Sequence, residues 1–459
     1  MNKIIRIAFV FGVLLPVCVQ AQSVTWQKWY DYKNVDNYGK DVIQTYDGGY
    51  IILTAVDEFL NFKVSMLKLS FLGEISWQNT IDSNATGDQG LLSSTILQSI
   101  DSGFIISGYT RDSALLIKTD NYGEIKWIKK YSGINEKMRF YDHVLLQDGC
   151  IVACGVLIPS NRTIILKTDS LGNNIYTNIY NLGSAKIIRY FESNYYFYHG
   201  NSISKVDSKG VLIWTKVIGN IVEILPVSFN SIYLAGGQDS LILNEIDSSG
   251  NIKMHKSYFP EAKCFSACFS KEGNILLAGY MNVKTRFEIA VAKVDLQGNQ
   301  IYVKTIDSFN NGTYYIYPTA VKPTNDYGFI FTGPTDFPIK GSDNAFGLKT
   351  DSICNAPTFT YINNNYLSIS NDFFLNQNYP NPFNGSTTIY YEILNPGNIK
   401  ISIFDIQGKE IVIYPEKYHP NGKYKLILNS DYLGLASGIY FLKLKYNNFF
   451  KLRKLALLK

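Results

Sequence analysis

A glycine-centred phrase returns six times along this chain and restricts the fold more than any other feature. The copies are "KLSFLGEISW" (68–77), "KTDNYGEIKW" (118–127), "KTDSLGNNIY" (167–176), "KVDSKGVLIW" (205–214), "EIDSSGNIKM" (245–254) and "KVDLQGNQIY" (293–302). Their glycines recur every 38 to 50 residues and are Gly73, Gly123, Gly172, Gly210, Gly250 and Gly298. A period of this length, with β-branched and aromatic runs between tight turns, is typical of a four-stranded propeller blade, which buries its faces against neighbouring blades.

A second phrase precedes each copy and occurs seven times, from "DGGYIILTA" (47–55) to "DYGFIFTGP" (326–334). "KTDSIC" (349–354) begins a seventh copy of the first phrase, but no strand follows it. The matching strand, "VTWQKWY" (24–30), lies near the other terminus. We therefore predict an all-β, seven-bladed β-propeller closed by an N-terminal strand, because an open solenoid gives no reason for the displaced strand. Four tryptophans then share one repeat position: Trp26, Trp77, Trp127 and Trp214.

The spacing of aspartate, glycine and tryptophan in the first phrase resembles the repeat of quinoprotein-like propellers, in which the tryptophan docks on the next blade. Those repeats carry one more residue between the aspartate and the glycine, so the resemblance implies an architecture and no quinone; we predict no cofactor. One acid per blade does not suit a single enzyme site. The repeat aspartates are therefore predicted to cap turns by hydrogen bonds to the backbone: Asp120, Asp169, Asp207, Asp247, Asp295 and Asp351.

The N-terminus has the pattern of a secretory signal peptide over residues 1–21. Two basic residues precede an apolar run from 7 to 15, and Val19-Gln20-Ala21 forms a small-residue cleavage site, so we expect cleavage after Ala21. Cys18 raises the lipoprotein alternative, but the residue before it, Val17, is too large for that signal. The predicted propeller then spans residues 22–354.

Residues 355–373 are polar, rich in Asn and Ser, and are predicted to form a linker. The last part of the chain, 374–459, contains about six strand-like runs: "TTIYYEI", "IKISIFD", "KEIVIY", "KYKLILN", "GIYFLKLKY" and "FFKLRKLALL". They predict a small immunoglobulin-like β-sandwich. In "NYPNPFN", Pro380 and Pro382 push the preceding residues toward extended geometry, so we expect a stiff lead-in that pins Tyr379 and Phe383 against the following domain.

This segment closely resembles the type A C-terminal sorting domain of the type IX secretion system of Bacteroidetes. The resemblance rests on "NYPNPFN" with "STTI", then "ISIFDIQGKEI", "LASGIYFLKL" and the basic tail "KLRKLALLK". Gly385 departs from it, since the family usually has Pro there. The matching residues are Tyr379, Pro380, Asn381, Pro382, Phe383, Asn384, Ser437, Gly438, Tyr440, Lys454 and Lys459.

The resemblance implies a partner and a destination. Such a domain directs its protein from the periplasm across the outer membrane through the type IX machinery. It is commonly removed by a sortase-like peptidase, and the cargo is anchored to surface lipopolysaccharide or released. The expected location is therefore secreted or on the outer-membrane surface.

The cargo region offers little recognisable chemistry. The four histidines stand alone, and "DSNATGD" (82–88) has Thr86 where a calcium loop needs a carboxylate or amide. No catalytic or metal residues are therefore predicted. The 43 basic residues against 38 acidic ones are scattered, which disfavours a nucleic-acid partner.

Two classes of function remain open for the cargo. We predict a monomeric, non-catalytic binding module for glycan or protein, with the ligand at the face or central channel of the propeller. The alternative is a secreted polysaccharide-degrading hydrolase or lyase, and fold alone does not choose between them. Two carboxylates, or a group of His, Tyr and Arg, converging in the central cleft would favour the enzyme.

Overall fold

A computed structural model describes residues 24–31, 35–58, 61–81, 92–228, 230–283, 286–306, 315–336, 343–357, 373–405, 410–446 and 449–459. The predicted signal peptide with Ala21, the loop 82–88 and most of the predicted linker lie outside the described residues. The described part of the chain folds into β-strands and turns, and it includes no helix that is long and apolar enough to cross a membrane. The all-β class predicted from the repeats is confirmed.

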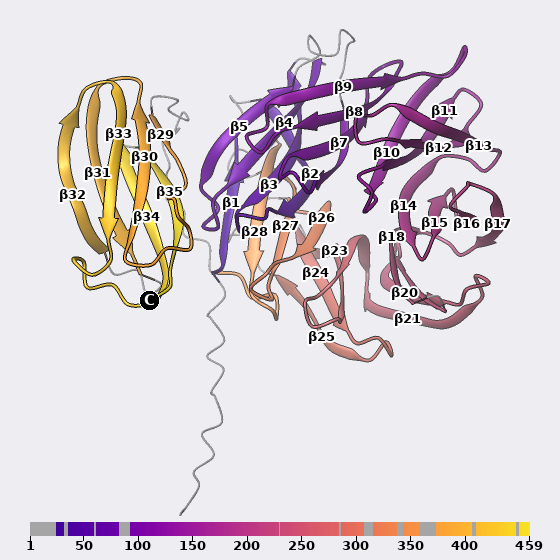
Figure 1. Ribbon diagram of the computed structural model, residues 1–459. Coiled ribbons are helices and arrows are strands. Elements are labelled where there is room, and N and C mark those ends of the chain that lie inside the picture. The colour runs from indigo at the N-terminus through magenta and orange to yellow at the C-terminus, as the bar shows by residue number, and fades with distance from the viewer. Residues whose placement is uncertain are drawn as a thin grey trace, which may run out of the picture.

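The described strands of the cargo region form seven four-stranded antiparallel sheets around a common centre (Figure 1). Six sheets take their strands in chain order. These are β2 (Asp36–Gln44), β3 (Tyr50–Glu58), β4 (Asn61–Leu69), β5 (Ile75–Ile81); β6 (Leu92–Gln98), β7 (Phe104–Tyr109), β8 (Ala114–Thr119), β9 (Ile125–Tyr131); β10 (Lys137–Leu145), β11 (Ile151–Ile158), β12 (Arg162–Thr168), β13 (Asn174–Tyr180); β14 (Ala185–Phe191), β15 (Asn194–His199), β16 (Ser202–Asp207), β17 (Leu212–Val217); β18 (Ile221–Ser228), β19 (Ser231–Gly236), β20 (Ser240–Ile246), β21 (Ile252–Pro260); β22 (Ala262–Phe269), β23 (Ile275–Val283), β24 (Arg286–Val294) and β25 (Gln300–Ile306).

The seventh sheet takes its outer strand from the N-terminal region. Its order is β1 (Trp26–Tyr30), β28 (Asn344–Thr350), β27 (Phe329–Thr335) and β26 (Ala320–Pro323). β1 pairs antiparallel with β28, with Trp26 opposite Lys349. The first and seventh sheets also meet directly, because the Thr319 hydroxyl donates to the carbonyl oxygen of Gly39 at 2.9 Å. The "VTWQKWY" strand therefore occupies the place expected from the repeats.

The core of the propeller lies between neighbouring sheets rather than within one sheet. Ile51 and Leu53 of the first sheet, for example, pack with Phe104 and Ile106 of the second in one buried cluster. Near-continuous apolar runs in the middle strands follow from this arrangement, because both faces of those strands are covered. The propeller thus holds its shape through contacts that repeat from one sheet to the next.

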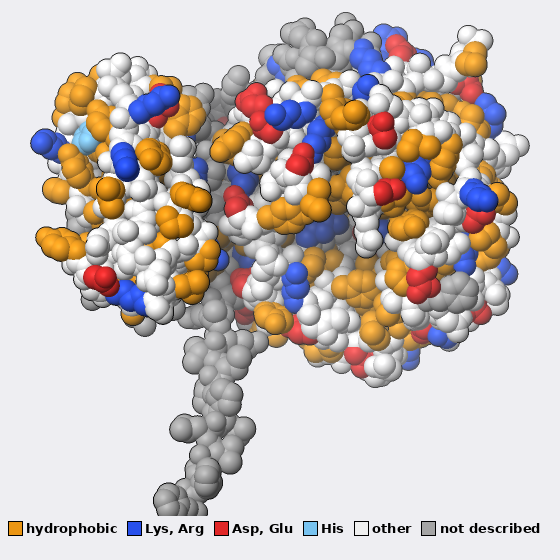
Figure 2. Space-filling view, in the orientation of Figure 1, with side chains coloured by type: hydrophobic (Ala, Val, Ile, Leu, Met, Phe, Trp, Pro, Cys, Tyr) orange, Lys and Arg blue, Asp and Glu red, His pale blue; other side chains and the backbone are white. Residues whose placement is uncertain are grey.

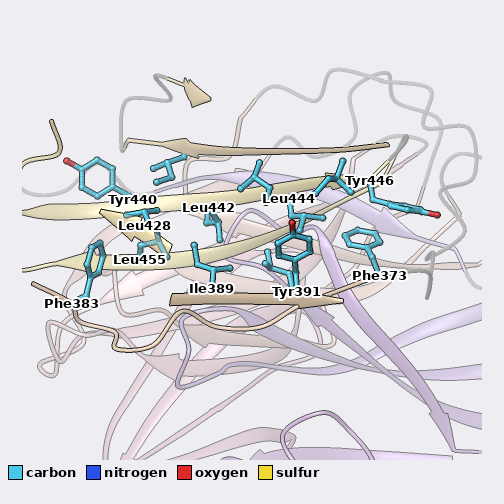
Figure 3. Close-up of a cluster of buried hydrophobic side chains, with 14 of the residues drawn as sticks. Phe373, Phe383, Ile389, Tyr391, Leu428, Tyr440, Leu442, Leu444, Tyr446 and Leu455 are labelled. Carbon is cyan, nitrogen blue, oxygen red and sulfur yellow. The ribbon is translucent and has the colours of Figure 1, made fainter. Parts of the chain in front are cut away.

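The C-terminal region forms a separate sandwich of two antiparallel sheets. One has the order β29 (Phe373–Leu375), β30 (Ser386–Ile393), β33 (Gly422–Asn429), and the other β32 (Glu410–His419), β31 (Gly397–Phe404), β34 (Gly438–Tyr446), β35 (Phe449–Leu457). Figure 3 shows side chains of both sheets meeting in one core. The described strands include β29 in addition to the six expected, and β29 begins at Phe373.

The sandwich lies beside the first propeller sheet (Figure 1). Phe71, in the turn between β4 and β5, stacks on Phe441 of β34 with 4.1 Å between the ring centroids. On the next strand, β35, the half-buried Arg453 interacts electrostatically with Asp47 of the propeller. The contact is local, because the buried clusters of the two domains share no residue.

Candidate functional site: the central channel and the C-terminal motif

The repeat tryptophans lie on the turn glycines of the neighbouring sheet. A Cβ atom added to Gly73 or Gly123 would come within 2.7 Å of the indole of Trp26 or Trp77. The same arrangement joins Trp127 to Gly172 and Trp214 to Gly250, while Gly210 faces Asn178 and Gly298 faces Met254. These glycines have φ between 74° and 82°, a region in which a side chain is disfavoured. The repeat residues therefore form the scaffold.

The turns themselves are capped by aspartates, which confirms that expectation. Oδ1 of Asp120 accepts hydrogen bonds from the backbone N–H groups of Tyr122 and Glu124, both at 2.9 Å. The other five repeat aspartates accept equivalent pairs of bonds: Asp169, Asp207, Asp247, Asp295 and Asp351. In the seventh copy Cys354 takes the place of the glycine, with φ 57°.

A cavity, which we call the channel, lies at the centre of the ring and is lined by residues of all seven inner strands, β2, β6, β10, β14, β18, β22 and β26. Its cavity measures about 590 Å³. Among the described residues that line it are four basic side chains and three carboxylates. Figure 2 shows basic side chains in the hollow at the centre of the propeller. This is the concave, polar site that the cargo offers to a ligand.

Six of the seven described inner strands carry a β-bulge at the same place in the sheet. A bulge inserts one extra residue and re-aims its side chain. We call the six extra residues the bulge ring: Lys40, Ser94, Tyr141, Lys186, Val222 and Phe265. All of them except Tyr141 line the cavity.

Glycines on the second strand of several sheets make room for the bulges. A Cβ atom at Gly155 would lie 1.7 Å from the carbonyl oxygen of Arg139, and one at Gly279 would lie 2.0 Å from that of Lys263. These glycines are the next-to-last residues of the second sequence phrase, as in "DGCIVACGV" and "EGNILLAGY". That recurring glycine is the signal from which the bulges could have been found.

Next to the bulge ring, carboxylate side chains accept hydrogen bonds from the backbones of neighbouring inner strands. Oδ1 of Asp41 accepts from the N–H of Val42 at 2.9 Å, and Oδ2 accepts from the N–H of Ile96 in the next sheet at 3.1 Å. Asp142 repeats this pattern with the N–H groups of His143 (2.9 Å) and Ile188 (3.1 Å). These side chains therefore link one sheet to the next around the channel.

Arg189 extends this network across three sheets. Its guanidinium donates to Asp142 at 2.6 Å and also pairs with Glu223. Burial lowers the pKa of Arg189, but Glu223 and Asp142 outweigh this effect and hold the pKa above its usual range. Burial likewise lowers the pKa of Lys322, and the nearby carboxylates of Asp41 and Glu223 reverse the shift. Both side chains therefore stay protonated, and nearby carboxylates balance their positive charge.

His143 is the buried histidine of this network. Its Nδ1 lies 2.9 Å from the Thr95 hydroxyl and 3.0 Å from the Ser107 hydroxyl. Burial lowers the pKa of His143 to about 4, and the opposing effect of Asp142 is smaller. The imidazole is therefore neutral at physiological pH. The described residues contain no group of three or more His, Cys, Asp or Glu side chains that could hold a metal ion.

The three carboxylates Asp41, Asp142 and Glu223 meet the criterion that would favour an enzyme, and sequence reasoning did not single them out. All three, however, accept hydrogen bonds from backbone N–H groups, and Glu223 and Asp142 share Arg189. Burial raises the pKa of Asp41, and Lys322 offsets only part of the rise. The hydrogen bonds of the three carboxylates join neighbouring strands and sheets around the channel.

In the C-terminal domain the "NYPNPFN" phrase lies along the closing strand β35. Phe383 is buried, its N–H donates to the carbonyl of Ala456, and its own carbonyl accepts from the N–H of Leu458, both at 2.9 Å. Asn381 exchanges hydrogen bonds with the backbone of Lys454 (3.1 Å) and Ala456 (2.8 Å). The expectation that the Tyr379 side chain is pinned is wrong, since it is 79% exposed.

The remaining motif residues support the same strand. Tyr440 belongs to the sandwich core, and its hydroxyl donates to the carbonyl of Ala436 at 2.9 Å. The backbone N–H of Lys459 donates to the Ser437 hydroxyl at 2.9 Å. Gly438 begins β34; Pro380 and Pro382 follow cis peptide bonds, and Asn384 is exposed. Motif residues from both ends of the domain thus meet around β35.

No curated protein matches the chain, whereas solved structures do. It is similar to the WD40 domain of Pan2 from Neurospora crassa (10% identity, 73% of this chain and 98% of that one, TM-score 0.49). It is also similar to YCF48 from Cyanidioschyzon merolae (10%, 70% and 98%, 0.46). The third likeness is to PorZ, an essential surface component of the type IX secretion system of Porphyromonas gingivalis (12%, 90% and 58%, 0.40).

The fold assignment rests on the strand pairing described above rather than on these likenesses. The family comparison is more specific, because it covers the C-terminal domain alone. Residues 377–457 match the family described as the secretion system C-terminal sorting domain. The C-terminal region of this chain is therefore a type IX secretion sorting domain, and it marks a β-propeller cargo for the cell surface or for secretion.

Proposed function

We propose that the exported propeller is a non-catalytic binding protein whose ligand docks at the bulge ring. One observation carries this proposal. Each inner strand with a bulge repeats the same backbone device, but the side chain placed there changes from Lys to Ser, Tyr, Val or Phe. The scaffold position that caps the turns is less variable, with an aspartate in six copies and Ser70 in the seventh.

The channel chemistry supports binding over turnover. A general acid and a base need carboxyl groups that can exchange protons with the substrate. Asp142 and Glu223 are engaged by Arg189 and by backbone N–H groups. Removing either charge would leave the guanidinium buried without a full partner, which is a structural cost.

A second candidate, a glycan-cleaving enzyme, is favoured by Asp41 alone. Its raised pKa suits a general acid, and it lines the same cavity as the bulge ring. Product analysis on polysaccharides with the purified protein separates the two functions. We expect no oligosaccharide release; release that disappears in the Asp41→Asn variant would establish the enzyme.

The binding function is tested with a glycan and matrix-protein array. Ser94→Trp places a large ring at the bulge, where Ser94 is half-buried at the channel wall. Lys271→Trp, on an exposed turn at the opposite end of the sheets, is the matched control. We expect ligands retained by the wild type to be lost in Ser94→Trp and kept in the control. Equal retention by both variants would contradict binding at the bulge ring.

Export is tested separately from binding. Removing residues 373–459 should leave a folded propeller in the periplasm of a host with type IX machinery, because the two domains have separate buried cores. We further propose removal of the signal peptide after Ala21 and cleavage of the tail by a sortase-like peptidase within 355–373. Fractionation with intact-mass analysis checks these points, and surface delivery of the truncated chain would refute the role of the tail.

A further inference from the structure

We propose that the bulge ring binds an acidic saccharide, meaning a glycan whose sugar rings carry carboxylate or sulfate groups. This inference rests on the binding function proposed above and names its ligand class. Two sets of residues carry it. Lysines supply the charge recognition, and a cluster of aromatic rings supplies a surface for sugar rings.

The lysines of the bulge ring differ from the other cations of the channel. Arg189 and Lys322 face the carboxylates of Asp41, Asp142 and Glu223. Lys40 and Lys186 line the same cavity, but within the described part of the chain neither forms an ion pair. Both ammonium groups lie over rings instead: Lys186 is 3.5 Å from the ring centroid of Tyr141, and Lys40 is 5.5 Å from that of Tyr38.

The half-buried state of Lys40 gives an incoming anion a reason to bind there. Burial lowers the pKa of Lys40, and no carboxylate offsets the shift. A cation removed from water without a partner is destabilised. A carboxylate or sulfate placed beside it would restore the lost interaction through a charge-assisted hydrogen bond. Lys40 therefore lacks an anionic partner, and a bound anion would supply one.

The aromatic cluster begins at Phe265 in the bulge ring. Phe265 stacks on Tyr280 with 5.2 Å between centroids, and Tyr317 lies 5.7 Å from Tyr280 and 6.1 Å from Phe265. Phe287 and Tyr315 continue the cluster, and Phe265 is the ring of the five that lines the cavity. Such rings offer flat apolar surface beside polar hydroxyl groups, which matches the C–H face and the hydroxyl rim of a sugar ring.

The position of Phe265 around the ring favours a single ligand that contacts both kinds of residue. Phe265 belongs to the sixth sheet, Lys186 to the fourth and Lys40 to the first, so each lysine lies two sheets away from the aromatic cluster. Phe265 and both lysines line the same cavity, so one ligand that fills the cavity can contact all three. A ring-free acidic chain such as hexaglutamate would use the lysines but has no flat ring to place on Phe265, so it is the competing outcome of the test.

The test is calorimetric titration of the full chain with four probes: hexagalacturonate, a sulfated galactose hexamer, a neutral galactose hexamer and hexaglutamate. We expect binding of one or both acidic sugars, with affinity that falls between about 50 mM and about 300 mM salt because charges are screened. Lys40→Gln, Lys186→Gln and Phe265→Ala should each weaken binding about tenfold. Lys209→Gln and Lys271→Gln, which change exposed lysines on turns, should bind as the wild type does.

The outcomes separate this inference from the proposed function. If the neutral sugar or hexaglutamate binds as tightly as the acidic sugars, the proposal of an acidic saccharide as the ligand is wrong. The Ser94→Trp variant still tests, independently, whether binding occurs at the bulge ring. Acidic sugar bound equally by the wild type and by Ser94→Trp would instead place the ligand elsewhere and overturn both. Melting temperatures of all variants must match that of the wild type within a few degrees, so that lost binding is not lost folding.

Discussion

The propeller sheets differ between the end that carries the capped turns and the end that carries the bulges. At the turn end similar side chains return: aspartate caps six of the turns and Ser70 caps another, and in most sheets a large residue of the neighbouring sheet lies on the turn glycine. At the bulge end the backbone irregularity returns in six sheets, and the extra residue is Lys in two of them and Ser, Tyr, Val or Phe in the others. The repeats thus separate the scaffold from the surface that we propose binds the ligand. Substitutions at the turns should affect stability, and those at the bulges should affect binding.

The largest effect on stability is expected from deleting residues 24–30, which removes β1. Trp26 and Tyr30 are buried, the Trp26 indole donates to the carbonyl of Phe71, and the Tyr30 hydroxyl donates to that of Gly73. The loss should exceed roughly 5 kcal/mol, since burying each large aromatic alone contributes about 3 kcal/mol. Urea unfolding followed by tryptophan fluorescence measures it. An unchanged midpoint would show that β1 contributes nothing to the ring.

A glycine pair tests the docking of the tryptophans. Gly123 has φ 80°, and a Cβ there would lie 2.7 Å from the Trp77 indole, whereas Gly273 has φ 85° with no atom within 4 Å. Both Gly→Ala changes cost about 1 to 2 kcal/mol for the backbone. Gly123→Ala should cost about 2 kcal/mol more because the indole must move. Equal losses in thermal unfolding of the two variants would rule out a role for this contact.

The buried histidine gives a pH dependence with a defined sign. The pKa of His143 is about 4 in the folded protein, below the value of about 6.5 expected when unfolded. Its contribution is therefore complete above pH 6.5 and is lost as the pH falls toward 4, by about 3 kcal/mol in total. His143→Gln should lose less stability than the wild type between pH 7 and pH 4.5. Parallel losses would contradict the depressed pKa.

The smallest effect is expected at the bulge ring. Lys186 is exposed and Lys40 is half-buried without a carboxylate partner. Lys186→Gln and Lys40→Gln should therefore change the free energy of unfolding by no more than about 0.5 kcal/mol. A loss as large as that of Gly123→Ala would make these lysines part of the scaffold and remove the contrast between the two ends.

The sequence was sufficient to predict the features that recur as motifs, but not the arrangement of the side chains in the channel. Trp26 could be placed in the last sheet because it shares a motif with Trp77, and the C-terminal domain could be recognised because its motifs occur in order. Asp41, Asp142 and Glu223 could not be predicted as one network. They come from strands far apart in sequence and lie outside both recurring phrases. Each directly follows the extra residue of a bulge, and the ring geometry brings them together.

The exposed Tyr379 shows a second limit. Proline restricts the backbone before it, and the backbone of Tyr379 does pair with Thr388 through two hydrogen bonds of 2.9 and 3.0 Å. Backbone restriction does not decide the direction of the side chain, however. Phe383 is buried because the closing strand β35 covers it, and that contact joins segments separated by most of the domain.

The strand that completes the seventh sheet also sets the timing of folding. The Gln27 side chain donates to the carbonyl of Pro357, 330 residues away. The first strand to emerge during synthesis must therefore wait for almost the whole cargo before its partner exists, and such distant pairing makes folding slow. Until then the edge of the unfinished sheet is open to other strands. The sorting domain follows Pro357 in the sequence. It is therefore synthesised directly after the residues that allow the last propeller sheet to close.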